Sequence, residues 1–157
     1  MKREGEMREA IRARAQRIDG LRSVVTVEGH AVVVDPPPEE GGTGTGMSAP
    51  QLFTAAMAAC IVGFIANSCR LRNIPLTRLE VELTAPIQGG PRRVGDMEVV
   101  VRMEPEPPEE VRQHLLAVAR RATLLNTLAR PLRVVIRFAS GADDAGPPPP
   151  AAAGPPA

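Results

Sequence analysis

The chain has 157 residues, a formal net charge of +1 from 19 basic and 18 acidic side chains, no Trp, no Tyr and three Phe. A nearly neutral charge and a shortage of aromatic stacking residues exclude the usual signature of a nucleic-acid-binding protein. Two cysteines are too few for a disulfide scaffold. The length predicts one domain with short extensions.

The first 20 residues are predicted to form a helical extension. Ile11 and Ala15 lie four residues apart with arginines around them, which indicates a short helix over residues 7–18. Asp19-Gly20 would end it. Charges run through this extension, so it does not have the pattern of a signal peptide, and we expect a cytoplasmic protein.

The next elements are predicted to be a β-hairpin and a loop. Two β-branched runs, residues 24–27 and 31–34, are separated by Glu28-Gly29-His30, the pattern of two strands and a tight turn. The Pro- and Gly-rich residues 36–46 predict an irregular loop. No Lys-Ser or Lys-Thr follows its glycines, so the loop does not resemble a phosphate-binding loop.

Residues 52–66 form an apolar run without a charged side chain. Ser48 suits a helix N-cap and Pro50 suits the first turn, so a long helix is predicted to continue to about residue 70 or 72. The run is shorter than the roughly 18 residues that indicate a membrane span, so no membrane contact is expected. A helix that is apolar on every side must be surrounded by protein. We therefore predict a homodimer that wraps it.

The second half of the domain is predicted to contain a hairpin, a helix and a strand. Residues 79–83 and 97–103 alternate apolar and polar side chains on either side of a Gly-rich turn. Pro108 begins a helix whose apolar residues keep helical spacing as far as Leu125. Residues 132–138 are predicted to be the last strand.

These elements indicate an α+β fold, because the strands come in antiparallel pairs and the helices are segregated from them. The predicted domain covers residues 21–139. Residues 140–157 are rich in Pro and Ala and predict a disordered tail, since they cannot bury enough apolar surface to become ordered.

Cys60 lies in the middle of the apolar helix and is the main candidate for chemistry. Helical spacing places it on one face with Phe53, Met57 and Phe64. Apolar surroundings raise the pKa of a thiol and make it inert, which favours a core residue. A reactive Cys60 would need a cation brought close by the fold, and arginine is the best candidate.

The other cysteine and the two histidines have no evident partner. Cys69 follows Cys60 by nine residues, which places the two on opposite helix faces about 13 Å apart along the axis. A disulfide needs Cα atoms within about 7 Å, so these cysteines cannot form one within a single chain. His30 and His114 do not have metal-ligand spacing, so no metal site is predicted.

Three segments together resemble the OsmC/Ohr family, named for osmotic induction and organic hydroperoxide resistance. Residues 30–35 and the following Gly-Gly-Thr-Gly-Thr-Gly look like the family's strand and glycine loop. Residues 51–60 look like its helix motif, which ends in Ala-Ala-Cys. Asn126-Thr127-Leu128 matches the end of a Cys-Pro-Val-x-Asn-Thr-Leu motif. The resemblance runs from about Gly29 to Phe138.

The resemblance implies antiparallel hairpins that wrap two central helices in an intertwined homodimer. It also implies a peroxidase in which Cys60 is the attacking cysteine and becomes a sulfenic acid. In the family, a second cysteine then forms a disulfide that an external dithiol reduces. No cofactor is implied.

The chain departs from the family at the positions that assist this cysteine. Ala122 stands where the resolving cysteine is expected. Pro50 and Gln51 stand where the helix motif carries a glutamate, which belongs to a charge network with an arginine. Arg22 is the candidate for that arginine.

The sequence thus supports two main hypotheses from different classes. The first is a single-cysteine reductase of organic hydroperoxides in which Cys60 is catalytic and an external thiol is the reductant. The second is a non-catalytic dimer that binds a small apolar ligand near Cys60. Transfer of sulfur or another group on the thiol is a third possibility.

Overall fold

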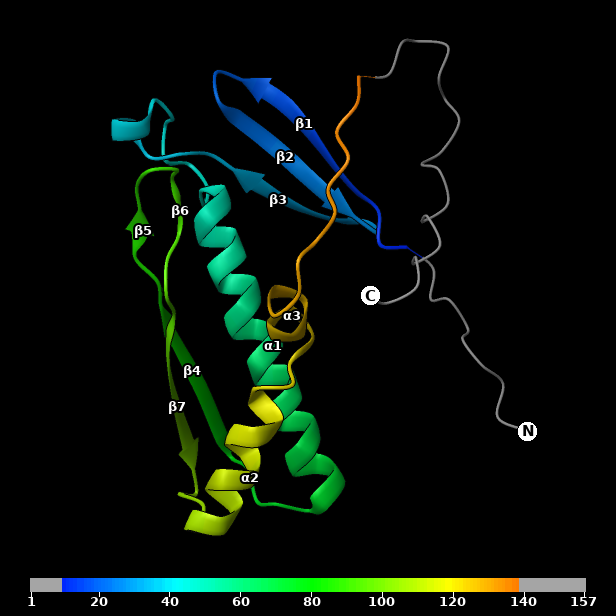
Figure 1. Ribbon diagram of the computed structural model, residues 1–157, viewed down its shortest axis with the longest axis vertical. Coiled ribbons are helices and arrows are strands. Elements are labelled where there is room, and N and C mark those ends of the chain that lie inside the picture. The colour runs from blue at the N-terminus through cyan, green and yellow to red at the C-terminus, as the bar shows by residue number, and fades with distance from the viewer. Residues whose placement is uncertain (1–9, 139–157) are drawn as a thin grey trace, which may run out of the picture.

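The computed structural model describes residues 10–138. Figure 1 shows three parts: an N-terminal sheet, the long helix α1 (Ala49–Arg72), and a second sheet with two short helices beside α1. The strands pair in antiparallel fashion and the helices are separate from them. The α+β class predicted from the sequence is confirmed.

The N-terminal sheet contains three strands in the order of the chain. They are β1 (Ala13–Asp19), β2 (Arg22–Val27) and β3 (His30–Val34). The hairpin predicted over residues 24–34 is confirmed. The helix predicted over residues 7–18 is wrong in its described part, because residues 13–19 pair with β2 instead. The limits of the domain, including the tail at 140–157 that lies outside the described residues, stay a prediction.

One face of this sheet is apolar and has no cover in the described part of the chain. Alternation along the paired strands places small and β-branched side chains on the same face: Ala13, Ala15, Val25, Val27, Val32 and Val34. None of the residues of the three strands is buried. An antiparallel sheet normally covers one such face with a helix or a second sheet, so residues 10–138 alone leave this face incomplete.

A short loop connects β3 to α1 and sets the start of the helix. It contains one turn of 3-10 helix, η1 (Pro38–Glu40), a regular turn that the Pro and Gly content did not predict. Ser48 is the N-cap of α1, and its side chain accepts a hydrogen bond from the backbone N–H of Gln51. The helix ends at Asn73, which has a φ of 53°. The predicted start and end of this helix are confirmed.

The second sheet and two helices pack against α1. The elements are β4 (Arg78–Thr84), β7 (Glu98–Glu104), α2 (Glu109–Ala119) and α3 (Thr123–Leu128). β4 pairs with β7, as predicted, and their connection holds a small extra hairpin, β5 (Ile87–Gln88) and β6 (Arg93–Val94). The core between these elements consists of Ile61, Ile65, Cys69, Leu115, Ala119 and Ala122.

Two predictions for the C-terminal part of the domain are wrong. The single helix expected from residue 109 to 125 is broken at Ala122, whose ψ of 139° is not helical. Residues 132–138 are irregular and exposed rather than a strand. A strand forms only where a neighbouring strand offers backbone hydrogen bonds, and none of the described strands pairs with this segment.

Helix α1 is long and apolar enough to cross a membrane by length and composition alone. This is weak support for a membrane span, because the core helix of a soluble protein has the same properties. In its most apolar window, 28% of the residues are buried. The buried residues are Met57, Ile61, Ile65, Ser68 and Cys69. The other residues of α1 are half-buried or exposed, and the described part of the chain leaves the side with Ala56, Ala59 and Gly63 uncovered.

Candidate functional site

Cys60 lies at the boundary between the packed and the exposed sides of α1. It is half-buried and contacts the core cluster that α2 and α3 complete. Ala56, Ala59 and Gly63, on the next face of the helix, are exposed. The thiol is therefore neither sealed in the core nor open to solvent on all sides, and a molecule that covers the exposed side would complete its surroundings.

Cys69 has a different environment. It is free, as predicted, and only 1% exposed within the core. Burial raises the pKa of its thiol above the ordinary value. Because the thiolate is the reactive form, this cysteine is suited to packing rather than to chemistry.

Gln51, which stands where the resemblance led us to expect a glutamate, caps the helix in this structure. The side-chain Oε1 of Gln51 accepts a hydrogen bond of 2.7 Å from the backbone N–H of Ser48. Together with the bond from Gln51 N–H to the Ser48 hydroxyl, this makes a complete capping box. Gln51 stabilises the first turn of α1 and carries no charge that could assist Cys60.

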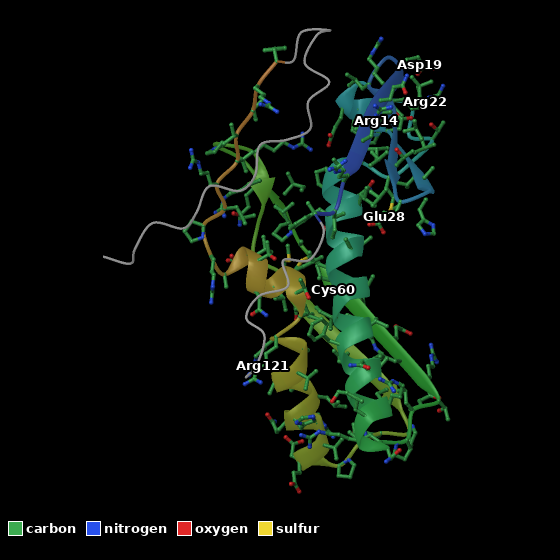
Figure 2. The ribbon with its side chains drawn as sticks, turned by 90° about the vertical axis from the view of Figure 1, so that its right-hand side faces the viewer. Arg14, Asp19, Arg22, Glu28, Cys60 and Arg121 are labelled. Carbon is green, nitrogen blue, oxygen red and sulfur yellow. The ribbon has the colours of Figure 1, made fainter. Side chains whose placement is uncertain are left out.

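Arg22, the candidate activating arginine, lies in the N-terminal sheet and not beside Cys60 (Figure 2). Its Nη2 donates to Asp19 Oδ2 at 2.5 Å. Its Nε is buried and makes no hydrogen bond to any described residue. Within residues 10–138, no charged side chain donates a hydrogen bond to the Cys60 sulfur. One chain by itself does not bring the predicted Cys60 and Arg22 together.

Ala122, which stands where the resemblance led us to expect a resolving cysteine, lies in the core cluster that Cys60 contacts. It is 0% exposed, and it belongs to the core cluster against which Cys60 packs. The break between α2 and α3 places it there, since it is the N-cap residue of α3. The side chain at this position is a methyl group and offers no thiol to Cys60.

A wide, open surface cavity of about 680 Å³ lies over Phe53, two turns before Cys60 on the same side of α1, and Cys60 itself does not line it. Apolar side chains of Met97 and Leu128 line it, together with the charged groups of Arg93 and Asp96. The sequence did not predict this cavity, because its wall comes from β6, the loop after it and α3, which are distant along the chain.

The histidines show no sign of a metal site. His114 Nε2 and the hydroxyl of Ser68 are 3.1 Å apart, which links α2 to α1. His30 begins β3 and is exposed. Among the described residues, no group of three or more His, Cys, Asp and Glu side chains is placed to hold a metal ion.

The sequence profile of the OsmC-like protein family matches residues 42–137. This match covers most of the domain, including α1 with Cys60 and the α2–α3 region with Ala122. The chain belongs to the OsmC-like protein family. A comparison with curated protein sequences gave no match.

Solved structures of OsmC-like proteins have the same fold as this chain. An osmotic stress induced and detoxification response protein from Psychrobacter arcticus has a TM-score of 0.71 at 17% identity, covering 78% of this chain and 90% of that one. The organic hydroperoxide resistance protein OsmC from Legionella pneumophila has a TM-score of 0.61 at 20% identity, covering 78% and 91%. An organic hydroperoxide resistance protein from Vibrio cholerae, with captopril bound in one of its active sites, has 0.58 at 25% identity, covering 80% and 90%.

In this OsmC-like chain, Asp35 organises the loop before α1. Its carboxylate is 1% exposed and accepts hydrogen bonds from the backbone N–H and the hydroxyl of both Thr43 and Thr45, at 2.5 to 3.1 Å. The bond from the Thr43 hydroxyl is the main reason that the pKa of Asp35 lies well below its ordinary value of 3.8. The spacing of Asp35 from Thr43 and Thr45 is the sequence pattern that encodes this loop. It was not recognised from the sequence alone.

The low pKa of Asp35 predicts how stability depends on pH. A group whose pKa is lowered by folding adds stability above its unfolded pKa, and this stability is lost as the pH falls below about 4. Asp35→Asn should lower the melting temperature at pH 7 by roughly 5–10 °C, because the amide nitrogen cannot accept the bonds from Thr45. Thermal unfolding followed by circular dichroism at pH 7 and pH 3 measures this.

The pH profile of the variant is the control for this prediction. Between pH 7 and pH 3, the melting temperature of Asp35→Asn should fall less than that of the wild type. Thr43→Ser keeps the hydroxyl and should stay near the wild type. Equal falls for wild type and Asp35→Asn would contradict a role for the ionised carboxylate.

Proposed function

We propose that this OsmC-like protein is a homodimeric, single-cysteine reductase of organic hydroperoxides, with Cys60 as the nucleophile. The observation that carries the proposal is the place of Cys60: half-buried in an apolar cluster, at the edge of the exposed face of α1, at the end of the family's helix motif. The Legionella pneumophila and Vibrio cholerae relatives with this fold are named organic hydroperoxide resistance proteins.

The reaction needs one protein thiol and two molecules of an external thiol. The Cys60 thiolate attacks the terminal oxygen of the hydroperoxide, the O–O bond breaks, and the organic part leaves as an alcohol after taking a proton. Cys60 becomes a sulfenic acid. An external thiol attacks its sulfur, releases water and forms a mixed disulfide. A second external thiol displaces the first as a disulfide and returns the Cys60 thiol.

The external thiol is required because of Ala122. A resolving cysteine at this buried position would condense with the sulfenic acid inside the protein, and alanine cannot. The sulfenic acid must therefore stay reachable from solvent or from a partner until a small thiol arrives. The position of Cys60 at the edge of the exposed helix face supports such access.

Three uncovered apolar surfaces support the homodimer. They are the apolar face of the N-terminal sheet, the exposed side of α1, and the segment of residues 132–138. The exposure of all three surfaces is accounted for if a second copy of the chain covers them. Large contiguous apolar patches are rare on the surface of a monomer. In such a dimer, a charged group that activates Cys60 comes from the other subunit.

The cavity over Phe53 supports an organic rather than an inorganic peroxide. Phe53, Met97 and Leu128 offer an apolar wall on the Cys60 side of α1 that suits an alkyl or aryl group. Hydrogen peroxide has no such group and gains nothing from this wall. We further propose a cytoplasmic location, where small thiols are kept reduced.

Replacing Cys60 tests the proposal directly. The purified protein with dithiothreitol should consume cumene hydroperoxide, and Cys60→Ser should reduce the rate at least about a hundredfold, because the hydroxyl is a far weaker nucleophile than a thiolate. Peroxide loss is followed with a ferrous-iron colour assay. Cys69→Ser is the matched control and should keep the wild-type rate. Equal rates for wild type and Cys60→Ser would contradict the proposal.

A non-catalytic dimer that binds a small apolar ligand is the second candidate. The observation that favours it is the missing charge around Cys60: Gln51 replaces the acid and caps the helix, and Arg22 binds Asp19. The rate of reaction of Cys60 with a thiol reagent, measured against pH in Cys69→Ser, separates the candidates. Half-maximal reaction well below pH 8.5 supports the reductase, and a higher midpoint supports the binding protein.

A further inference from the structure

A second cavity, of about 330 Å³, lies between β7 and α2 over the C-terminal half of α1. Its floor is hydrocarbon: Ile65, Val101, Met103, Pro107, Leu115 and Leu116. Ile65 and Cys60 are five residues apart, so they point to different sides of the helix. This cavity is therefore separate from the proposed peroxide site. Its volume is at the lower end of the range for small-molecule sites.

The polar residues that line the cavity are Arg102, Glu106 and Arg112. Arg102 uses Nη1 for both of its bonds, to Glu80 at 3.2 Å and Glu82 at 2.8 Å. Its Nη2 and Nε make no hydrogen bond to the described residues. Its strand neighbours Val101 and Met103 pack on the core, so alternation along β7 turns the Arg102 side chain to the other face of the sheet. An anion in the cavity therefore has to be bound by Arg112.

Arg112 stands on the other side of the cavity with a weakly held partner. Its Nη2 donates to Glu106 at 3.1 Å, and its Nε lies 3.4 Å from Glu109. The side chain of Glu106 is 82% exposed, so this ion pair contributes little stability and can be exchanged for another carboxylate at small cost. Nη1 of Arg112 has no partner in the described part of the chain.

We propose that this cavity binds a small molecule with an aliphatic or aryl body and one carboxylate group. The body lies on the hydrocarbon floor, and the carboxylate takes the place of Glu106 on Arg112, where Nη1 is also free to donate. Guanidinium groups bind carboxylates through parallel N–H donors, which gives direction as well as charge. The site does not depend on Cys60 and adds a binding activity to the proposed reductase.

Three probes of equal chain length test the proposal: octanoate, octanol and octylamine. The full chain, labelled at its methyl groups, is titrated by NMR. Octanoate should shift the methyl signals of Ile65, Leu115 and Leu116 and should bind about three- to tenfold more tightly than octanol, with octylamine weakest. Equal binding of octanoate and octanol, or shifts that map elsewhere, would overturn the proposal.

Charge variants at the rim sharpen this test. Arg112→Gln should remove the preference for octanoate over octanol, and Glu106→Gln should strengthen octanoate binding, since it frees the guanidinium. Arg70→Gln, an exposed arginine on α1 away from the cavity, is the matched control and should change neither affinity. Cys60→Ser should bind octanoate like the wild type. Octanoate binding that is lost in Cys60→Ser, or unchanged in Arg112→Gln, would refute the assignment.

Discussion

Gly63→Arg should separate the proposed dimer into monomers. It should also abolish peroxide consumption, because the proposed activating charge comes from the other subunit. Gly63 lies on the exposed side of α1 in line with Ala56, Ala59 and Asn67. A Cβ added there meets no atom of the described chain within 4 Å. If two copies pack through this side, the variant buries two unpaired guanidinium groups at the closest point of the interface.

The expected effect is large because a buried, unpaired charge costs several kcal/mol and each 1.4 kcal/mol is a tenfold change in affinity. Dimer dissociation should become at least about a hundredfold more favourable, as measured by light scattering after size-exclusion chromatography. The helix itself should not suffer, since arginine is a better helix former than glycine by about 0.8 kcal/mol.

Gly89→Arg is the matched control, because a Cβ at Gly89 also meets no neighbouring atom, in the turn between β5 and β6. It should leave both the dimer and the activity unchanged. A wild-type protein that is monomeric at micromolar concentration, or a Gly63→Arg variant that stays dimeric, would contradict the proposed interface.

Ala122→Cys should convert the protein to a two-cysteine mechanism. Ala122 is fully buried in the cluster against which Cys60 packs, so the introduced thiol belongs to the same cluster as the proposed sulfenic acid. Added peroxide should then form a disulfide between Cys60 and the introduced thiol, with the loss of two free thiols by reagent titration. The extra sulfur in a filled site costs about 1–3 kcal/mol of stability.

The disulfide should also protect Cys60 from irreversible oxidation. At high peroxide, mass spectrometry should find sulfinic acid on the wild-type Cys60 and little of it in Ala122→Cys. Ala122→Ser is the control, because a serine side chain has nearly the volume of a cysteine side chain and cannot form a disulfide with Cys60. Its Cys60 should be oxidised like that of the wild type. A folded Ala122→Cys protein whose Cys60 oxidises without forming the bridge would show that the two positions do not meet.

The sequence predicted those elements whose signals are local. The start of α1 depends on Ser48 and Pro50, and the hairpin of β2 and β3 depends on a Glu-Gly turn between β-branched runs. Residues 7–18 were predicted as a helix because Ile11 and Ala15 fit helical spacing, whereas residues 13–19 form strand β1. Their strand depends on pairing with β2, a tertiary contact that outweighs local spacing.

The candidate site was predictable in its position and not in its surroundings. The Ala-Ala-Cys motif pointed to Cys60, and helix geometry correctly separated Cys69 from it. The cavity over Phe53 is built from segments far apart in the chain, and no short motif encodes it. The hydrogen bond between Gln51 and Ser48 was not predicted either. A residue in the first turn of a helix can cap the helix or assist a catalytic group, and its position in the sequence does not distinguish the two roles.

The Asp35 loop has a consequence for the order of folding. All the hydrogen bonds that its carboxylate accepts come from residues eight or ten positions later in the chain. Closing so short a segment costs little chain entropy, so the loop and the first turn of α1 can form early and within one chain. The apolar face of the N-terminal sheet has no such local partner among the described residues, and in the proposed dimer it would be covered only when two chains meet.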